Sequence, residues 1–255
     1  MPLLATGSIR THVQVLGPPG GAPPLVMLHG LLVGSLAEWY FTAAPRLARR
    51  RTVVLYDLRG HGKSDRPPSG YDAATLAGDL AELVDAVPVA TPLDLVGHSF
   101  GGLVALRFAL HHPGLVGKLA LVDVPLPPSL LPEMARLDAS SAERLVESLP
   151  GPIRDAFAGG GRRARKIAGA LRALTLETTL LDDLRREPDV PDAELRTLAL
   201  PVLAIFGASS RCLPAGERIA RAVPGARLEV LPGGHFLPLE CPGYLADALE
   251  TFLVG

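Results

Sequence analysis

Gly97-His98-Ser99-Phe100-Gly101 is the stretch of this chain that decides its fold. The apolar residues 93–96 lead into it and a helical pattern over 102–110 leads out. The stretch therefore predicts a serine on a tight turn between a buried strand and an amphipathic helix, with small neighbours because the backbones approach closely there. Such a turn exposes the Ser99 hydroxyl. It also directs the Phe100 amide and the helix N-terminus at a negative charge forming beside that hydroxyl.

Three further motifs, two before this turn and one after it, have a recognisable pattern. LVMLHG at 25–30 is a strand that runs into a His-Gly loop, DLRGHGKSD at 57–65 is a glycine-rich loop after the next strand, and GGHF at 233–236 precedes Glu240 and Pro242. Together with the serine turn, the motifs resemble the α/β-hydrolase superfamily. The resemblance implies a doubly wound, mostly parallel α/β sheet with an inserted helical lid.

The spacing of apolar runs predicts the same architecture and locates the insertion. Short apolar runs alternate with helical patterns, as in a doubly wound sheet, and the predicted strands are 12–16, 25–28, 52–56, 93–96, 118–122, 202–206 and 227–231. The interval between the fifth and sixth of these is far longer than a helical crossover needs. We therefore predict a core of 1–124 and 201–255, with a helical lid of 125–200 over the carboxyl edge of the sheet.

Composition narrows the class of protein. A chain of 255 residues with 48% hydrophobic residues can bury one sizeable core. The formal net charge of −1 gives no indication of nucleic acid or an anionic membrane as a partner. The N-terminus lacks a signal-peptide pattern and no run approaches the ~18 apolar residues of a membrane span, which predicts a cytoplasmic protein.

Metal, nucleotide and disulfide signatures are weak in this sequence. Cys212 and Cys241 are too few for a disulfide framework, and two thiols are favoured over a single bridge. No Cys, His or Asp cluster has metal-ligand spacing, and no G-x-G-x-x-G opens a helix after the first strand. We therefore expect neither a metal nor another cofactor.

Ser99 needs a base, because a serine hydroxyl is a poor nucleophile at neutral pH unless a neighbour takes its proton. His235 is the candidate, since it follows the last predicted strand in a glycine-rich loop. The resemblance implies that this loop carries the histidine back over the sheet to the serine. His29, His61 and His98 lie in other motifs and have weaker claims.

The acid that would orient His235 is the point at which this chain departs from the family pattern. Most relatives carry it in a segment resembling Gly-x-x-Asp after the strand that follows the lid, and Ser210 stands at that position here. Asp123 is the best substitute, because it directly follows the strand 118–122 and functional groups collect at the carboxyl ends of parallel strands. Some relatives of the superfamily, such as haloalkane dehalogenases, place their acid after this strand. A serine–histidine pair without an acid, or another carboxylate, is the alternative.

The resemblance also implies an oxyanion hole and an apolar pocket. The backbone amides of Leu31 and Phe100 are the expected donors to the oxyanion, each typically worth ~3 kcal/mol in the transition state. Apolar residues near the motifs are candidates for the pocket wall, although each can instead be plain core: Leu32, Trp39, Leu126, Leu130 and Phe236.

These residues favour a serine hydrolase that acts on an ester, thioester or lactone with an apolar moiety, through an acyl-enzyme on Ser99. The expected partner is thus a small apolar substrate. Fold alone does not fix chemistry, so two alternatives stay open. One is a non-hydrolytic enzyme of the same fold, such as a cyclase, a lyase or a cofactor-free dioxygenase. The other is a ligand-binding receptor or pseudoenzyme.

Overall fold

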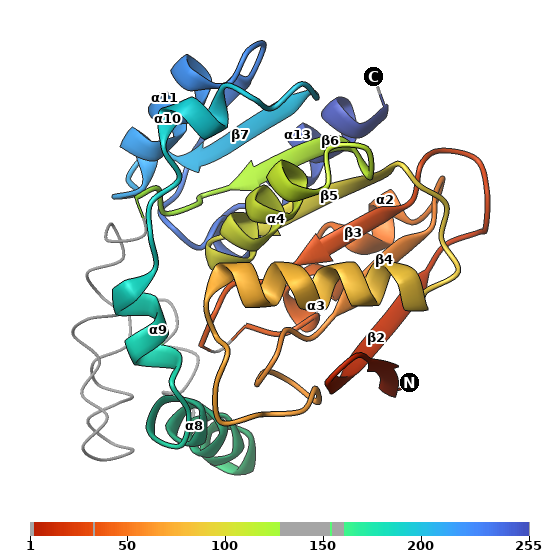
Figure 1. Ribbon diagram of the computed structural model, residues 1–255. Helices are drawn as coiled ribbons and strands as arrows, with labels where there is room; N and C mark the ends of the chain where they lie inside the picture. Colours follow the sequence, from red (N-terminus) through yellow and green to blue (C-terminus); the bar gives the residue numbers. More distant parts are fainter. Residues whose placement is uncertain (1–2, 33, 128–153, 155–160, 255) are drawn as a thin grey trace.

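A computed structural model describes residues 3–32, 34–127, 154 and 161–254 of the chain (Figure 1). Its centre is an eight-stranded sheet of order β1-β2-β4-β3-β5-β6-β7-β8. The strands are β1 Leu3–Thr6, β2 Ile9–Leu16, β3 Leu25–Leu28, β4 Val53–Tyr56, β5 Leu93–His98, β6 Val116–Val122, β7 Val202–Gly207 and β8 Arg227–Leu231. β2 pairs antiparallel with β1 and β4, and the pairs from β4 to β8 are parallel. The predicted fold class is confirmed.

Helices cover both faces of this sheet. They are α1 Ala37–Tyr40, α2 Ala44–Leu47, α3 Ala73–Ala86, α4 Phe100–His111, α8 Gly161–Leu176, α9 Leu180–Arg186, α10 Asp192–Leu195, α11 Leu213–Ala222, α12 Leu237–Glu240 and α13 Pro242–Val254. No helix in the described part of the chain has the length and apolar composition that a membrane span requires.

The two-residue period of the strands divides the core into two clusters. Val26 and Leu28 of β3 face a cluster that includes α3, α4 and α11, whereas Leu25 and Met27 face a cluster that includes α1, α2 and α13. All four residues are buried, and this explains why the central strands read as continuous apolar runs rather than as alternating ones.

Each predicted strand is present, and one further strand was not predicted. β1 (Leu3–Thr6) is a short edge strand that pairs with β2 in antiparallel register. Its apolar run is short, Leu3 to Ala5, and its side chains are largely exposed, unlike those of the central strands. β1 extends the sheet but lies far from the serine turn in strand order.

Helices α8, α9 and α10 lie in the long interval between β6 and β7. Figure 1 shows α8 and α9 at the end of the sheet toward which the parallel strands point. The backbone amides of Tyr71 and Ala73, at the start of α3, donate to Asp183 (2.9 Å) and Glu187 (2.8 Å), which fastens this segment to the core. The lid boundaries at 125 and 200 stay a prediction, since 128–153 and 155–160 lie outside the described residues.

Candidate active site

Ser99 stands on a strained turn between β5 and α4. Its backbone has φ 53° and ψ −127°, a conformation that side-chain-bearing residues rarely adopt. A Cβ on Gly97 would lie 2.5 Å from the Gly101 carbonyl oxygen, and a Cβ on Gly101 would lie 2.3 Å from that of His29. The two glycines are therefore required, because the turn packs directly against neighbouring backbone. This packing holds the Ser99 side chain at the carboxyl end of the sheet.

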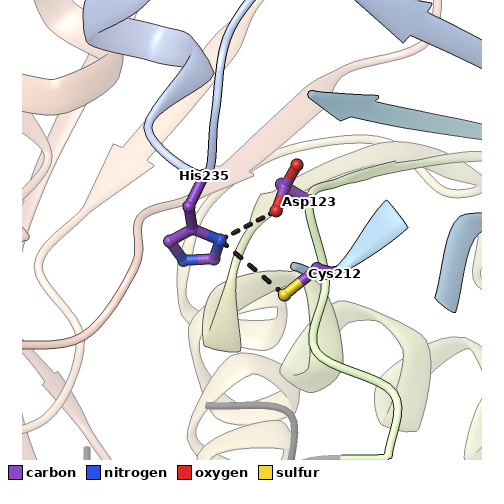
Figure 2. Close-up of side chains that lie close together, drawn as sticks. All are labelled: Asp123, Cys212 and His235. Carbon is purple, nitrogen blue, oxygen red and sulfur yellow. Dashed lines mark hydrogen bonds and ion pairs between the residues drawn. The ribbon is translucent and has the colours of Figure 1, made fainter. Parts of the chain in front are cut away.

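A continuous hydrogen-bonded chain connects Ser99 with a buried carboxylate. Nε2 of His235 lies 2.8 Å from Oγ of Ser99, and Nδ1 of His235 lies 2.8 Å from Oδ1 of Asp123. Figure 2 shows the His235 ring with Nδ1 directed at Asp123. Asp123 follows β6 and is fully buried, whereas His235 lies in the loop after β8. In this arrangement an imidazole can take the serine proton while a carboxylate fixes its tautomer.

Ser210, the residue at the family's usual acid position, contacts Asp123. Its hydroxyl donates to Oδ1 of Asp123 at 2.5 Å and accepts from the Cys212 amide at 3.0 Å. The second carboxylate oxygen, Oδ2, accepts from the Gly207 amide at 2.8 Å. Asp123 has φ 47°, and these hydrogen bonds hold its side chain in place despite that unfavourable backbone. Besides His235, the carboxylate thus receives two donors from the end of β7 and the turn that follows it.

The loop after β3 passes directly against Ser99. A Cβ on Gly30 would lie 3.3 Å from the Cβ of Ser99, so the next residue, Leu31, is close to the serine. Phe100 is the first residue of α4, and the first amides of a helix have no partner within it. The two amides predicted for the oxyanion hole therefore come from segments that border Ser99.

His29 fixes this loop. Its Nε2 accepts from the Leu58 amide at 3.0 Å, and its Nδ1 donates to the Gly30 carbonyl at 2.7 Å. An imidazole with one accepting and one donating nitrogen is neutral. Burial lowers the pKa of His29, which agrees with the neutral form.

His98 links the serine turn with the loop that carries His235. Its Nδ1 lies 3.0 Å from Oε1 of Glu38 and its Nε2 lies 2.8 Å from the carbonyl oxygen of His235. Both neighbours are acceptors, so both ring nitrogens must donate and the ring is an imidazolium. Burial opposes that charge, but the Glu38 carboxylate outweighs it and the pKa of His98 is raised. Burial likewise opposes the charge on Glu38, and His98 outweighs it to lower the pKa of Glu38.

The predicted pocket residues differ in burial and in their position relative to Ser99 and His235. The Phe236 ring is partly exposed and its centroid lies 5.1 Å from that of His235. Leu32, with φ 68°, packs partly buried against the core beside the oxyanion loop. Leu126 is 1% exposed and belongs to the main core cluster. Leu130 lies outside the described residues.

Trp39 occupies the core, which the sequence left open as the alternative to the pocket. Its side chain is fully buried in the cluster beneath α1, α2 and α13, and its indole N–H donates to the Leu28 carbonyl at 2.9 Å. A tryptophan whose polar atom is paired with backbone inside the core is positioned for packing. In this structure Trp39 therefore packs as a core residue.

Two residues support the site in roles that the sequence did not predict. Glu38 follows the oxyanion loop in α1, and nothing in its local sequence distinguishes it from a surface carboxylate. Glu240 accepts from the Gly234 and Phe236 amides at 2.5 and 3.3 Å, on either side of His235, and so holds the histidine loop. The spacing of Glu240 from the GGHF motif was the only signal for this role.

Comparison with known proteins places the chain in a family. The family model described as alpha/beta hydrolase fold matches residues 23–157. The putative carbamate hydrolase RutD of Klebsiella pneumoniae is 32% identical over 91% of this chain and 90% of its own length. A soluble epoxide hydrolase of a Corynebacterium species is 29% identical over 91% of each chain. A solved esterase structure from a Rhodococcus species matches with a TM-score of 0.79 and 26% identity, over 97% of this chain and 95% of that one. The chain therefore belongs to the α/β-hydrolase family and is an enzyme of that fold.

Proposed function

We propose that this protein is a serine hydrolase that cleaves a carboxylic ester, thioester or lactone through an acyl-enzyme on Ser99. The observation that supports this most is the hydrogen-bonded chain Asp123–His235–Ser99, with 2.8 Å at both contacts to the imidazole. The esterase among the structural neighbours agrees with this substrate class.

In the first half-reaction, Oγ of Ser99 attacks the substrate carbonyl carbon while Nε2 of His235 takes the hydroxyl proton. Asp123 keeps the proton on Nδ1 and stabilises the imidazolium that forms. The amides of Leu31 and Phe100 donate to the oxyanion. The tetrahedral intermediate then collapses, and His235 returns its proton to the departing alcohol or thiol, which leaves Ser99 acylated.

In the second half-reaction, a water molecule takes the place of the leaving group. His235 removes its proton, the hydroxide attacks the acyl carbonyl, and Ser99 departs with the proton that His235 returns. Two partly buried side chains, Leu32 and Phe236, border this centre and are the described candidates for contact with an apolar acyl or alcohol group. The substrate partner we propose is accordingly a small apolar molecule.

A fluorophosphonate probe tests the proposal, because it forms a covalent bond only with an activated serine. We expect the parent to be labelled and to hydrolyse p-nitrophenyl esters. Ser99→Ala is expected to lose both properties while keeping its melting temperature, since the turn accepts an alanine. Ser209→Ala is a matched control, because that exposed serine donates only to the Gly233 carbonyl, at 2.9 Å. It should retain both.

The outcomes separate the alternatives. Labelling of Ser99 without turnover of any ester, thioester or lactone would favour a non-hydrolytic enzyme of this fold. Stabilisation by apolar ligands without labelling would favour a receptor. Undiminished hydrolysis by Ser99→Ala would contradict the acyl-enzyme.

A further inference from the structure

Cys212 lies against the histidine of the candidate site, although the proposed proton transfer does not use its sulfur. Its Sγ is 3.9 Å from Nδ1 of His235. Figure 2 shows the sulfur and the Asp123 carboxylate approaching the same ring nitrogen from different directions. Cys212 is 2% exposed and Asp123 is fully buried, whereas His235 is partly exposed, so the three side chains form a cluster that is buried on all but the histidine side.

The cluster has the composition of a transition-metal site. It offers a thiol, an imidazole and a carboxylate, and these ligand atoms of Asp123, Cys212 and His235 all lie within 4.8 Å of one another. Zn²⁺ and similar cations prefer this combination of sulfur, nitrogen and oxygen, and a three-ligand zinc site keeps one position for water. The residues come from the end of β6, the start of α11 and the loop after β8. This wide separation in sequence explains why ligand spacing did not reveal them.

We propose that Asp123, Cys212 and His235 form an inhibitory site for a soft divalent cation such as Zn²⁺. Tetrahedral bond lengths require the sulfur and nitrogen to lie about 3.5 Å apart, and the nitrogen and oxygen about 3.4 Å. The observed separations are 3.9 Å for Sγ···Nδ1 and 2.8 Å for Nδ1···Oδ1. A tetrahedral site therefore needs a slight approach of the sulfur to Nδ1 and a movement of the imidazole about half an ångström away from Asp123. The sulfur and the carboxylate oxygen, which lie within 4.8 Å of each other, must also be about 3.5 Å apart.

Binding would disable the imidazole as a base. The cation takes the lone pair of Nδ1, so the single imidazole proton moves to Nε2, and the Cys212 thiol releases its proton to solvent on becoming a thiolate. The Nε2–H group then faces Ser99 and has no lone pair with which to accept the hydroxyl proton. The inhibitory effect rests on the proposed hydrolase function. The binding site itself does not.

Cobalt binding tests the site independently of catalysis. Co²⁺ bound to a thiolate produces a sulfur-to-metal charge-transfer band in the near ultraviolet. We expect this band when Co²⁺ is added to the parent and to Cys241→Ala, and we expect Zn²⁺ to displace it. Cys212→Ala should lack the band. Cys241 is a suitable control because it is also a buried thiol but belongs to the opposite core cluster.

Zinc inhibition tests whether metal binding disables His235 as a base. We expect Zn²⁺ to suppress both ester hydrolysis and fluorophosphonate labelling of Ser99 in the parent, and a chelator to restore them, which separates metal binding from oxidation of the thiol. Each variant is compared with its own metal-free activity. Cys212→Ala should need at least about tenfold more Zn²⁺ for half-inhibition, since losing even an outer hydrogen-bond partner of a metal ligand commonly costs ~10–100-fold in affinity.

Two results would overturn the site. One is the absence of a thiolate band in the parent, and the other is a band that persists in Cys212→Ala and disappears in Cys241→Ala. Equal zinc sensitivity of the parent and Cys212→Ala would show that inhibition arises elsewhere. If no ester is hydrolysed but the cobalt band behaves as expected, the proposed function fails and the metal site stands.

Discussion

Replacing Asp123 by asparagine tests the position of the acid, because the amide cannot satisfy the donors that surround the carboxylate. His235 and the Ser210 hydroxyl donate to Oδ1, and the Gly207 amide donates to Oδ2 at 2.8 Å. If the asparagine oxygen faces Gly207, its NH₂ group faces His235 and forces the imidazole proton onto Nε2. If the oxygen faces His235, the NH₂ group opposes the Gly207 N–H in a fully buried site, which costs about 1–3 kcal/mol.

Either orientation should impair proton transfer from Ser99. We expect kcat/KM to fall on the order of 10³- to 10⁴-fold, as the loss of the triad carboxylate does in serine proteases. This corresponds to about 4–5.5 kcal/mol of transition-state stabilisation. Ser210→Ala removes one neutral hydrogen bond and should cost roughly tenfold or less. The assay is p-nitrophenyl ester hydrolysis at neutral pH, with the rate of fluorophosphonate labelling as a second measure.

A rescue experiment sharpens the test. Asp123→Asn combined with Ser210→Asp returns a carboxylate to the neighbourhood of the imidazole, and we expect it to recover part of the lost activity. Asp123→Asn combined with Ser209→Asp adds the same charge one residue earlier, on an exposed side chain, and should recover none. An Asp123→Asn enzyme as active as the parent, together with a crippled Ser210→Ala, would refute the assignment of the acid to Asp123.

Four further predictions concern the elements around the site and one helix outside it. The raised pKa of His98 means that the charge on its ring contributes full stability below the unfolded pKa of about 6.5. This contribution is lost as pH rises through the folded-state pKa of His98. Glu38→Gln should therefore move the alkaline fall in melting temperature to lower pH, and an unchanged profile would argue against the imidazolium. Gly101→Ala should destabilise by about 3 kcal/mol or more in denaturant unfolding, because its Cβ would meet backbone. Gly169→Ala in α8, with open space around it, should instead gain roughly 0.5–1 kcal/mol. Trp39→Phe should lower the unfolding free energy by about 2–3 kcal/mol but leave kcat/KM within about twofold, and a selective change in KM would return this residue to the pocket.

Local patterns were sufficient to predict much of this molecule. Buried parallel strands read as short apolar runs, so seven strand positions were predicted and only the exposed edge strand β1 was missed. Ser99 lies in a motif whose glycines are required by close backbone contacts, and His235 follows Gly233, whose φ of 150° favours glycine, so both motifs are visible in the sequence. Asp123 was identified as a candidate by a general rule on strand ends, and the structure brings it to hydrogen-bonding distance of His235.

Contacts between residues far apart in the sequence could not be predicted, because no local pattern encodes them. The charge on His98 depends on Glu38 and on a carbonyl from the C-terminal loop, and these meet only after folding. Trp39 lies so soon after the oxyanion loop that its side chain could face either the pocket or the core. Only the packing of α1 decides between them. The approach of Cys212 to His235 depends on where α11 begins relative to β6, which no local pattern encodes.

The contact between Ser210 and Asp123 has a consequence for how such sites can change over time. β6 and β7 are adjacent parallel strands, with Val122 paired with Ile205, so the segments that follow them deliver side chains to the same side of one imidazole. An ancestor with carboxylates at both positions would have had a spare acid, and either could then be lost without passing through an inactive enzyme. The acid can therefore migrate between neighbouring strands by single substitutions while the nucleophile and base stay where they are.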